Sequence, residues 1–231
     1  MNLVVIILGV IVIILIYVLI QFFMEASVEL AATANLNDSI NGIPIKNNPT
    51  SSRYAYGVWI YVNSWNMGGI KPILARSNNL ALRLDENSPV LLCDITMNND
   101  EVKTIEFTDN FPLQKWVHVL VNVDNQYVDC YLDGKLIKSG RAYIESSDGI
   151  VVPKQPPAGG NSGVNLQLGG SAWDAYVARV KHWSNPVNPE EVWSTYMDGN
   201  GQGAVGSWLS KYGLDILIKK DNMEHRKLTL I

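Results

Sequence analysis

An uninterrupted apolar run near the N-terminus constrains this chain more than any other feature. No charged side chain occurs from Leu3 to Met24, and Gln21 is the only strongly polar residue there. Because roughly 20 residues rising ~1.5 Å each cross a hydrocarbon layer as a helix, the run is long enough for one transmembrane helix. We therefore expect a single-pass membrane protein anchored by residues 1–24, with residues 3–24 in the lipid bilayer.

A cleaved signal peptide is the alternative reading of this run. Such peptides begin with basic residues and carry a shorter apolar segment before the cut. Here Met1 and Asn2 precede the run without a Lys or Arg, which favours an uncleaved anchor. The orientation stays open, because Glu25 and Glu29 follow the run and the first basic side chain is Lys46.

Length, charge and cysteine content narrow the rest of the chain. The remainder, roughly 200 residues, fits one domain with extensions rather than two large domains. The net charge of -4, from 18 basic and 22 acidic side chains, gives no basic field, so we expect no nucleic-acid partner. Two cysteines, Cys93 and Cys130, are too few for a disulfide framework and are expected to be buried thiols.

Two segments of different composition follow the apolar run. Residues 25–52 are rich in Asn, Ser, Thr and Pro, so we interpret them as a tether. The tether contains the sequon Asn37-Asp38-Ser39, which matters only if it enters the secretory lumen. Residues 53–198 instead hold about ten short extended runs separated by turn residues, which predicts an antiparallel β-sandwich.

Local patterns refine this prediction. Alternation over Trp116 to Val123 places four valines on one face, which belongs in the core, with His118, Leu120 and Asn122 on the other. Asp133-Gly134 predicts a hairpin turn, because glycine accepts a positive φ. Asn188-Pro189 predicts the cap and first position of a short helix that closes the sandwich.

The ordered motifs resemble the concanavalin A-like, laminin G-like jelly-roll superfamily. In that family a Trp-x-His-Val strand leads to a Tyr-x-Asp-Gly-Lys hairpin, a Leu-Gly-Gly turn, a last strand and a Pro-Glu-Glu helix. The matching positions are Trp116, His118, Val119, Tyr131, Asp133, Gly134, Lys135, Leu168, Gly169, Gly170, Pro189, Glu190 and Glu191. The resemblance implies an all-β concanavalin A-like antiparallel sandwich (jelly roll) with a short helix after its last core strand. The apolar run adds one N-terminal transmembrane helix before it.

A second resemblance concerns the whole arrangement. The chain is similar to membrane-anchored, laminin G-like virion proteins of large icosahedral DNA viruses. The features that carry this similarity are the anchor, the Asn-rich tether, the run YGVWIYVNSW and the tail from YMDGNG to YGLDILIKKDN. This resemblance implies a minor capsid protein between an internal, host-derived membrane and the capsid shell. Capsid or other virion proteins are then its partners.

No catalytic or cofactor site is expected. Glycosidases of the superfamily carry a Glu-x-Asp-x-Glu strand, which does not occur here, and Asp129 and Asp133 read as solvated or turn-forming residues. The histidines His118, His182 and His225 are far apart in the sequence, so packing is the expected role of the first two. The run Gly201 to Gly206 fits the dinucleotide fingerprint but follows a helix, without a βαβ unit.

Residues in turn-rich stretches are the candidate contacts for a protein or glycan. Trp65 and Trp173 could offer large aromatic surfaces there, and Asp174 lies beside Trp173. Calcium is the one metal considered, with Asp174 and either Asp94 or Asp109 as oxygen ligands. The sequence contains no dense acidic loop of the kind that binds calcium. We therefore assign no metal or cofactor.

Residues 199–231 form a C-terminal extension with two short strand-like runs. Their alternating apolar residues are Leu214, Ile216, Ile218, Leu228 and Leu230. Either they pack on their own sandwich, or they dock on a neighbour by adding a strand to an exposed sheet edge.

The sequence as a whole predicts a membrane-anchored structural or assembly protein that binds and does not catalyse. A lectin-like attachment module is the alternative, and a divergent glycosidase is the third reading.

Overall fold

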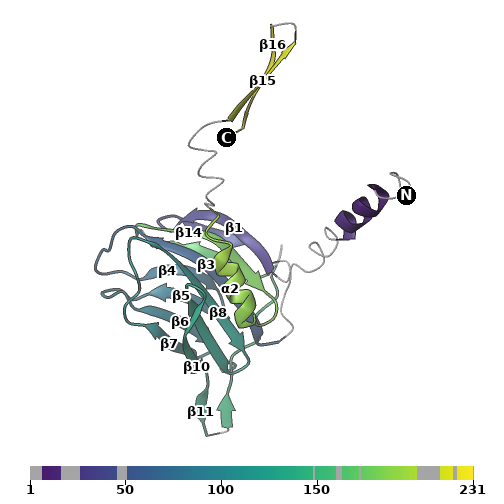
Figure 1. The fold of residues 1–231 in the computed structure, drawn as a ribbon. Coiled ribbons are helices and arrows are strands. Elements are labelled where there is room, and N and C mark those ends of the chain that lie inside the picture. The colour runs from purple at the N-terminus through teal and green to yellow at the C-terminus, as the bar shows by residue number, and fades with distance from the viewer. Residues whose placement is uncertain are drawn as a thin grey trace.

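Two facing six-stranded antiparallel sheets make up the body of the protein (Figure 1). The computed structural model describes residues 7–16, 27–45, 51–147, 149–159, 163–171, 173–201, 214–220 and 223–230. The first sheet has the order β1 (Ser27–Asn35), β14 (Ala175–Trp183), β3 (Arg53–Val62), β8 (Trp116–Asp124), β9 (Tyr127–Leu132) and β10 (Lys135–Arg141). The second has the order β2 (Ser39–Ile43), β13 (Leu166–Gly169), β4 (Lys71–Arg76), β5 (Leu80–Leu84), β6 (Leu91–Thr96) and β7 (Val102–Thr108).

The core lies between the two sheets, as the alternation in the sequence predicts. Val117, Val119, Val121 and Val123 of β8 are all at most 1% exposed within it. Cys93 of β6 and Cys130 of β9 are free and fully buried there, which confirms the expectation of buried thiols. The all-β sandwich predicted from the sequence is therefore confirmed.

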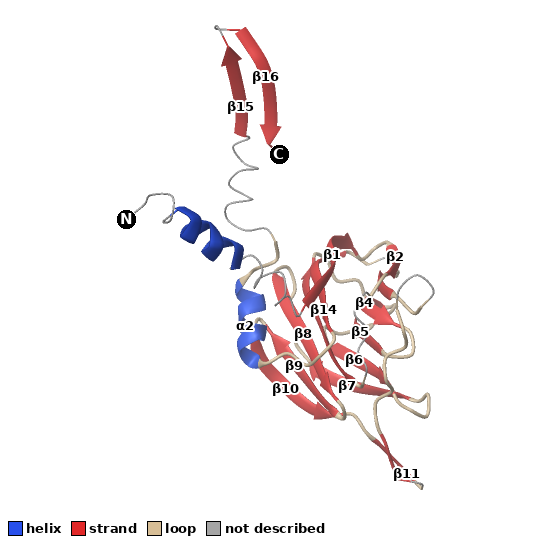
Figure 2. Ribbon diagram, turned by 90° about the vertical axis from the view of Figure 1, so that its right-hand side faces the viewer, coloured by secondary structure: helices blue, strands red, loops and turns tan. Residues whose placement is uncertain are grey.

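The outer face of the first sheet carries a second, smaller core. Helix α2 (Pro189–Met197) lies along this face, beside β8, β9 and β10 (Figure 2). Its N-cap is Asn188, whose side chain accepts a hydrogen bond from the Glu191 N–H at 2.8 Å, as predicted. The buried residues between helix and sheet are Ala55, Leu120, Tyr131, Trp183, Val187 and Val192. This cover explains why the face of β8 opposite the valines, with His118, Leu120 and Asn122, is also buried.

The hairpin between β9 and β10 has the turn that its sequence predicts. Asp133 and Gly134 both adopt positive φ, at 47° and 75°, as the preferred two-residue hairpin turn requires. A Cβ on Gly134 would come within 2.7 Å of the Trp193 ring. Glycine is therefore required here both for its φ and for the close approach of α2.

The interpretation of residues 25–52 as a tether is wrong for most of that segment. Residues 27–43 contain β1, which pairs with β14, and β2, which pairs with β13. Each is the edge strand of its sheet, so the segment belongs to the sandwich. Polar side chains obscure such strands in the sequence because one side of an edge strand faces water.

The N-terminal run is described only in part. Residues 7–16 form a helix with exposed apolar side chains, such as Ile13 at 68%. In the part of the chain that the structure describes, no helix has both the length and the apolarity that a membrane crossing requires. Residues 1–6 and 17–26 lie outside the described residues, so the anchor remains a prediction.

The two strand-like runs of the C-terminal extension pair with each other. β15 (Leu214–Lys220) and β16 (Met223–Leu230) form an antiparallel two-stranded sheet separate from the other two (Figure 1). The register places Leu214 opposite Leu230 and Ile216 opposite Leu228. Residues 202–213, which connect Gly201 to β15, lie outside the described residues.

A second two-stranded pair follows β10 in the chain. β11 (Ile144–Ser146) and β12 (Gly149–Val151) project from the sandwich as an antiparallel hairpin (Figure 1).

Candidate functional site

Three aromatic side chains line up across adjacent strands of the first sheet. The register places Tyr176 of β14 opposite Tyr61 of β3, and Tyr61 opposite Trp116 of β8. Their neighbours in sequence, Val177 and Val117 among them, point into the core, so these three lie on the outer face. We call Tyr61, Trp116 and Tyr176 the aromatic row.

The aromatic row remains accessible because α2 ends before it. Tyr196, in the last turn of the helix, stacks on Trp59 with ring centroids 5.6 Å apart. Trp59 lies two positions before Tyr61 on the same face, so the helix covers the preceding row of the sheet. Tyr176 is 41% exposed, and Tyr61 and Trp116 are half-buried.

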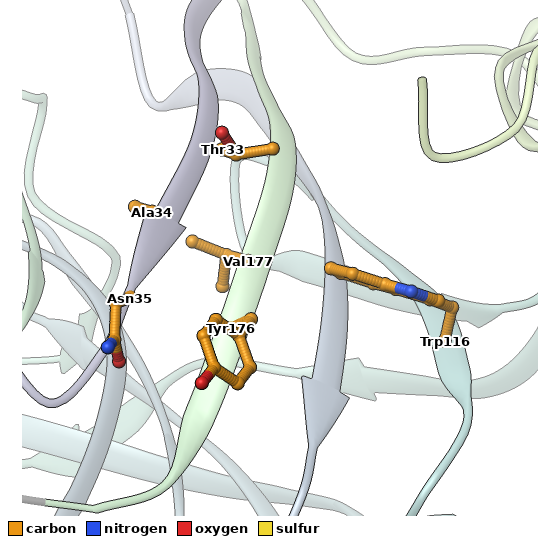
Figure 3. A pocket seen from close by; sticks show the side chains of 6 residues that line it. All are labelled: Thr33, Ala34, Asn35, Trp116, Tyr176 and Val177. Atoms are coloured by element: carbon orange, nitrogen blue, oxygen red, sulfur yellow. The ribbon is translucent and has the colours of Figure 1, made fainter. Parts of the chain in front are cut away.

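A hollow of about 380 Å³ adjoins the aromatic row (Figure 3). Strand β1 contributes Thr33, Ala34 and Asn35 to it, and the other walls are Trp116, Tyr176 and Val177. The rings of Tyr61 and Trp116 lie 5.6 Å apart and are inclined by 48°, so the row is twisted rather than flat. Aromatic faces beside a hydroxyl and an amide suit a ligand with one apolar face and several hydroxyl groups.

The candidate contact residues from the sequence lie at the same end of the sandwich but face inward. Trp173 is 4% exposed and its Nε1 donates to the Pro72 carbonyl oxygen at 3.2 Å, so its ring is not a free contact surface. Trp65 is half-buried against the core, with the Lys71 ammonium 4.4 Å from its ring centroid. Turn-rich sequence suggested exposure, but these loops fold back over the core.

Asp174 fastens the loop that follows β3. Its Oδ2 accepts hydrogen bonds from Asn63 Nδ2 at 2.6 Å and Ser64 Oγ at 3.1 Å. The Asp174 backbone carbonyl also accepts hydrogen bonds from the backbone N–H groups of Asn63 and Ser64. Because Asp174 stands two positions before Tyr176, it holds the loop beside the aromatic row.

The other oxygen ligands considered for calcium are separated or already engaged. Asp94 accepts from Arg83 Nε at 2.7 Å and from Thr104 Oγ1 at 2.6 Å. Over the described residues, no three His, Cys, Asp or Glu side chains come close enough together to hold a metal ion.

Three residues considered in the sequence, Asp133, His118 and His182, make contacts that stabilise the fold. Asp133 Oδ1 accepts from the His118 N–H at 2.9 Å, which confirms its role in the turn. His118 packs on Trp59 with ring centroids at 5.2 Å, and His182 packs on Tyr56 at 5.0 Å. Burial lowers the pKa of each imidazole from 6.5 to about 4, so both are neutral packing residues at pH 7.

Sequence comparison agrees with the architecture. The profile of the concanavalin A-like lectin/glucanases superfamily matches residues 37–193. No curated protein matches the sequence.

Similar solved structures include receptor-binding domains of botulinum neurotoxins. The serotype D binding domain is 16% identical with a TM-score of 0.50, over 74% of this chain and 42% of that one. A receptor-binding domain of the C/D mosaic serotype is 14% identical with a TM-score of 0.50, over 73% of this chain and 46% of that one. This chain thus spans less than half the length of those two structures, and identities this low establish a shared fold alone.

Proposed function

We propose, from the premise that this chain belongs to the concanavalin A-like lectin/glucanases superfamily, that it is a membrane-anchored, non-catalytic carbohydrate-binding protein. The observation that carries the proposal is the aromatic row beside the hollow of about 380 Å³. The apolar run from Leu3 to Met24 supports the anchor, since it is long enough to cross a bilayer and free of charge.

The chemistry of the row favours a sugar. A pyranose presents C–H groups on one face and hydroxyl groups around its rim. The C–H face can pack on the rings of Trp116 and Tyr176, while Thr33, Asn35 and the Tyr176 hydroxyl offer hydrogen-bonding groups nearby. The hollow has the volume of a small-molecule site, with a largely apolar lining and a few polar groups.

Binding without turnover fits the surroundings of the acidic residues near this site. Asp174 is bound by Asn63 and Ser64, and Asp133 is bound by the His118 N–H. Hydrolysis of a glycoside needs two carboxyl groups facing one bond, one of them as a proton donor. These two carboxylates serve instead to hold a loop and a turn.

A glycan array probed with the full chain in phosphatidylcholine nanodiscs tests the proposal. We expect binding to a defined set of glycans, reduced about tenfold or more by Trp116→Ala or Tyr176→Ala because each removes a stacking surface. Val102→Ala is the matched control, since Val102 is 59% exposed on edge strand β7 of the second sheet, away from the aromatic row. Absence of glycan binding, or equal loss in the control, contradicts the proposal.

Assembly is the second candidate function, and the separate β15–β16 sheet favours it. In this reading the chain is a minor capsid protein of a large DNA virus, in the internal virion membrane. Residues Leu214, Ile216, Ile218, Leu228 and Leu230 then form a tail that docks on a neighbouring capsid protein.

Truncation after Gly201 tests the assembly function. It keeps the contacts of Arg179 with the Asp198 and Gly199 carbonyl oxygens, so we expect the sandwich to melt as the full chain does. Incorporation into the native particle should be lost, as particle fractionation measures. Normal incorporation of the truncated chain excludes the docking tail.

A further inference from the structure

The chain between the apolar run and the sandwich is very short. Only Glu25 and Ala26 separate Met24 from Ser27, the first residue of β1. Because a residue spans at most ~3.6 Å, the start of β1 lies within roughly 11 Å of the end of the run. If the run is the anchor proposed above, the bilayer surface is close to this end of β1.

The register identifies which other segments share that end. Ser27 is opposite Trp183, which is opposite Ala55 of β3. Two positions further along, Arg53 pairs with Asp124, Asp124 with Tyr127, and Tyr127 with Arg141. The rim of the first sheet at the Ser27 end therefore holds Arg53, Asp124, Tyr127 and Arg141.

The β11–β12 hairpin projects from this same rim (Figure 1). It begins directly after Tyr143, and beyond β12 the Pro153 carbonyl oxygen accepts a hydrogen bond from Ser52 Oγ at 2.9 Å. Ser52 immediately precedes Arg53, so both ends of the hairpin are held at the rim. Ile150 on β12 is 60% exposed.

The rim has the composition of a surface that meets lipid headgroups. The Arg141 guanidinium lies 5.7 Å from the Tyr127 ring centroid and 5.0 Å from that of Tyr143. Tyrosine and arginine combine an apolar body with a polar end, which suits the boundary between hydrocarbon and water. An exposed isoleucine on a projecting hairpin can enter the acyl boundary.

We infer that the Ser27 end of the sandwich rests on the bilayer through Tyr127, Arg141, Tyr143 and Ile150, and that the aromatic row faces away from it. This inference rests on the proposed anchor. Asn35, at the row, follows Ser27 by eight residues along β1, or roughly 26 Å at ~3.3 Å per residue. Because the aromatic row faces away from this bilayer, a glycan that binds there is carried by a partner other than the membrane that anchors the chain.

Charge indicates which lipid the rim meets. Arg53 is paired with Asp124 at 2.8 Å, and Glu145 is exposed on β11, so acids accompany the two arginines. The rim therefore has no net basic field, and zwitterionic phosphatidylcholine suffices as its partner.

Depth-dependent fluorescence quenching tests this orientation. The full chain, with Ile150→Cys or Met67→Cys carrying a thiol-reactive fluorophore, is placed in phosphatidylcholine nanodiscs containing brominated lipid. Met67 is the matched control, because it is 77% exposed in the loop after the opposite end of β3. We expect quenching at Ile150, no quenching at Met67, and no change when phosphatidylserine is added.

The possible failures are distinct. Quenching at Met67, or at neither position in chains that co-purify with nanodiscs, overturns the orientation and leaves the anchor intact. A chain that does not co-purify with nanodiscs overturns the anchor and the inference together, while glycan binding at the row is judged separately on the array.

Discussion

Acidification from pH 7 to pH 4 is expected to lower the free energy of unfolding by several kcal/mol. His118 and His182 are each 1% exposed, and burial lowers the pKa of each from 6.5 to about 4. Lys181 and Arg179 lower the pKa of His118 further, and Arg76 that of His182. Between these pH values the unfolded chain binds protons that the folded chain excludes, so stability falls by up to about 3 kcal/mol per histidine.

Urea denaturation at pH 7, 5.5 and 4.5 measures this loss. His182→Phe should flatten the dependence on pH at little cost at pH 7, because neither buried ring nitrogen has a hydrogen-bond partner among the described residues. His118→Phe should act similarly, since the ring packs against Trp59 and Tyr196. If the double variant keeps the steep dependence of the parent, other groups cause the acid sensitivity.

Val121→Asp is expected to prevent folding or to lower the melting temperature drastically. Val121 is 1% exposed between the two sheets, where a carboxylate has no compensating partner and costs several kcal/mol. Thermal melting followed by circular dichroism measures the effect.

Leu136→Asp is the matched control for this substitution. It introduces the same charge into the first sheet, but Leu136 is 53% exposed on edge strand β10. We expect it to melt close to the parent. Similar melting of the two variants contradicts the burial assigned to β8.

Much of the fold was predictable because it is encoded locally. The valines of β8 alternate with period two, Asp133-Gly134 specifies its turn, and Asn188-Pro189 specifies the start of α2. Strands β1 and β2 were missed because their stability comes from β14 and β13, which lie more than 120 residues further along the chain. Edge strands with polar faces resemble loops when their partners are unknown.

The candidate site was less predictable, because it exists only after the strands are in register. Tyr61, Trp116 and Tyr176 are separated by more than 50 residues each and share no motif. The alternation of β8 assigns Trp116 to the face opposite the valines, but only the register brings two tyrosines beside it. Trp173 was instead expected to offer a contact surface, but it is buried. A position in a glycine-rich turn does not determine whether a ring is buried.

The two free cysteines provide an internal reporter of sandwich opening. Cys93 and Cys130 belong to opposite sheets, and burial raises the pKa of each thiol. Because alkylating reagents attack the thiolate, neither residue should react until the sheets separate. The rate of modification of the native chain then follows the free energy of that opening, without any label or mutation.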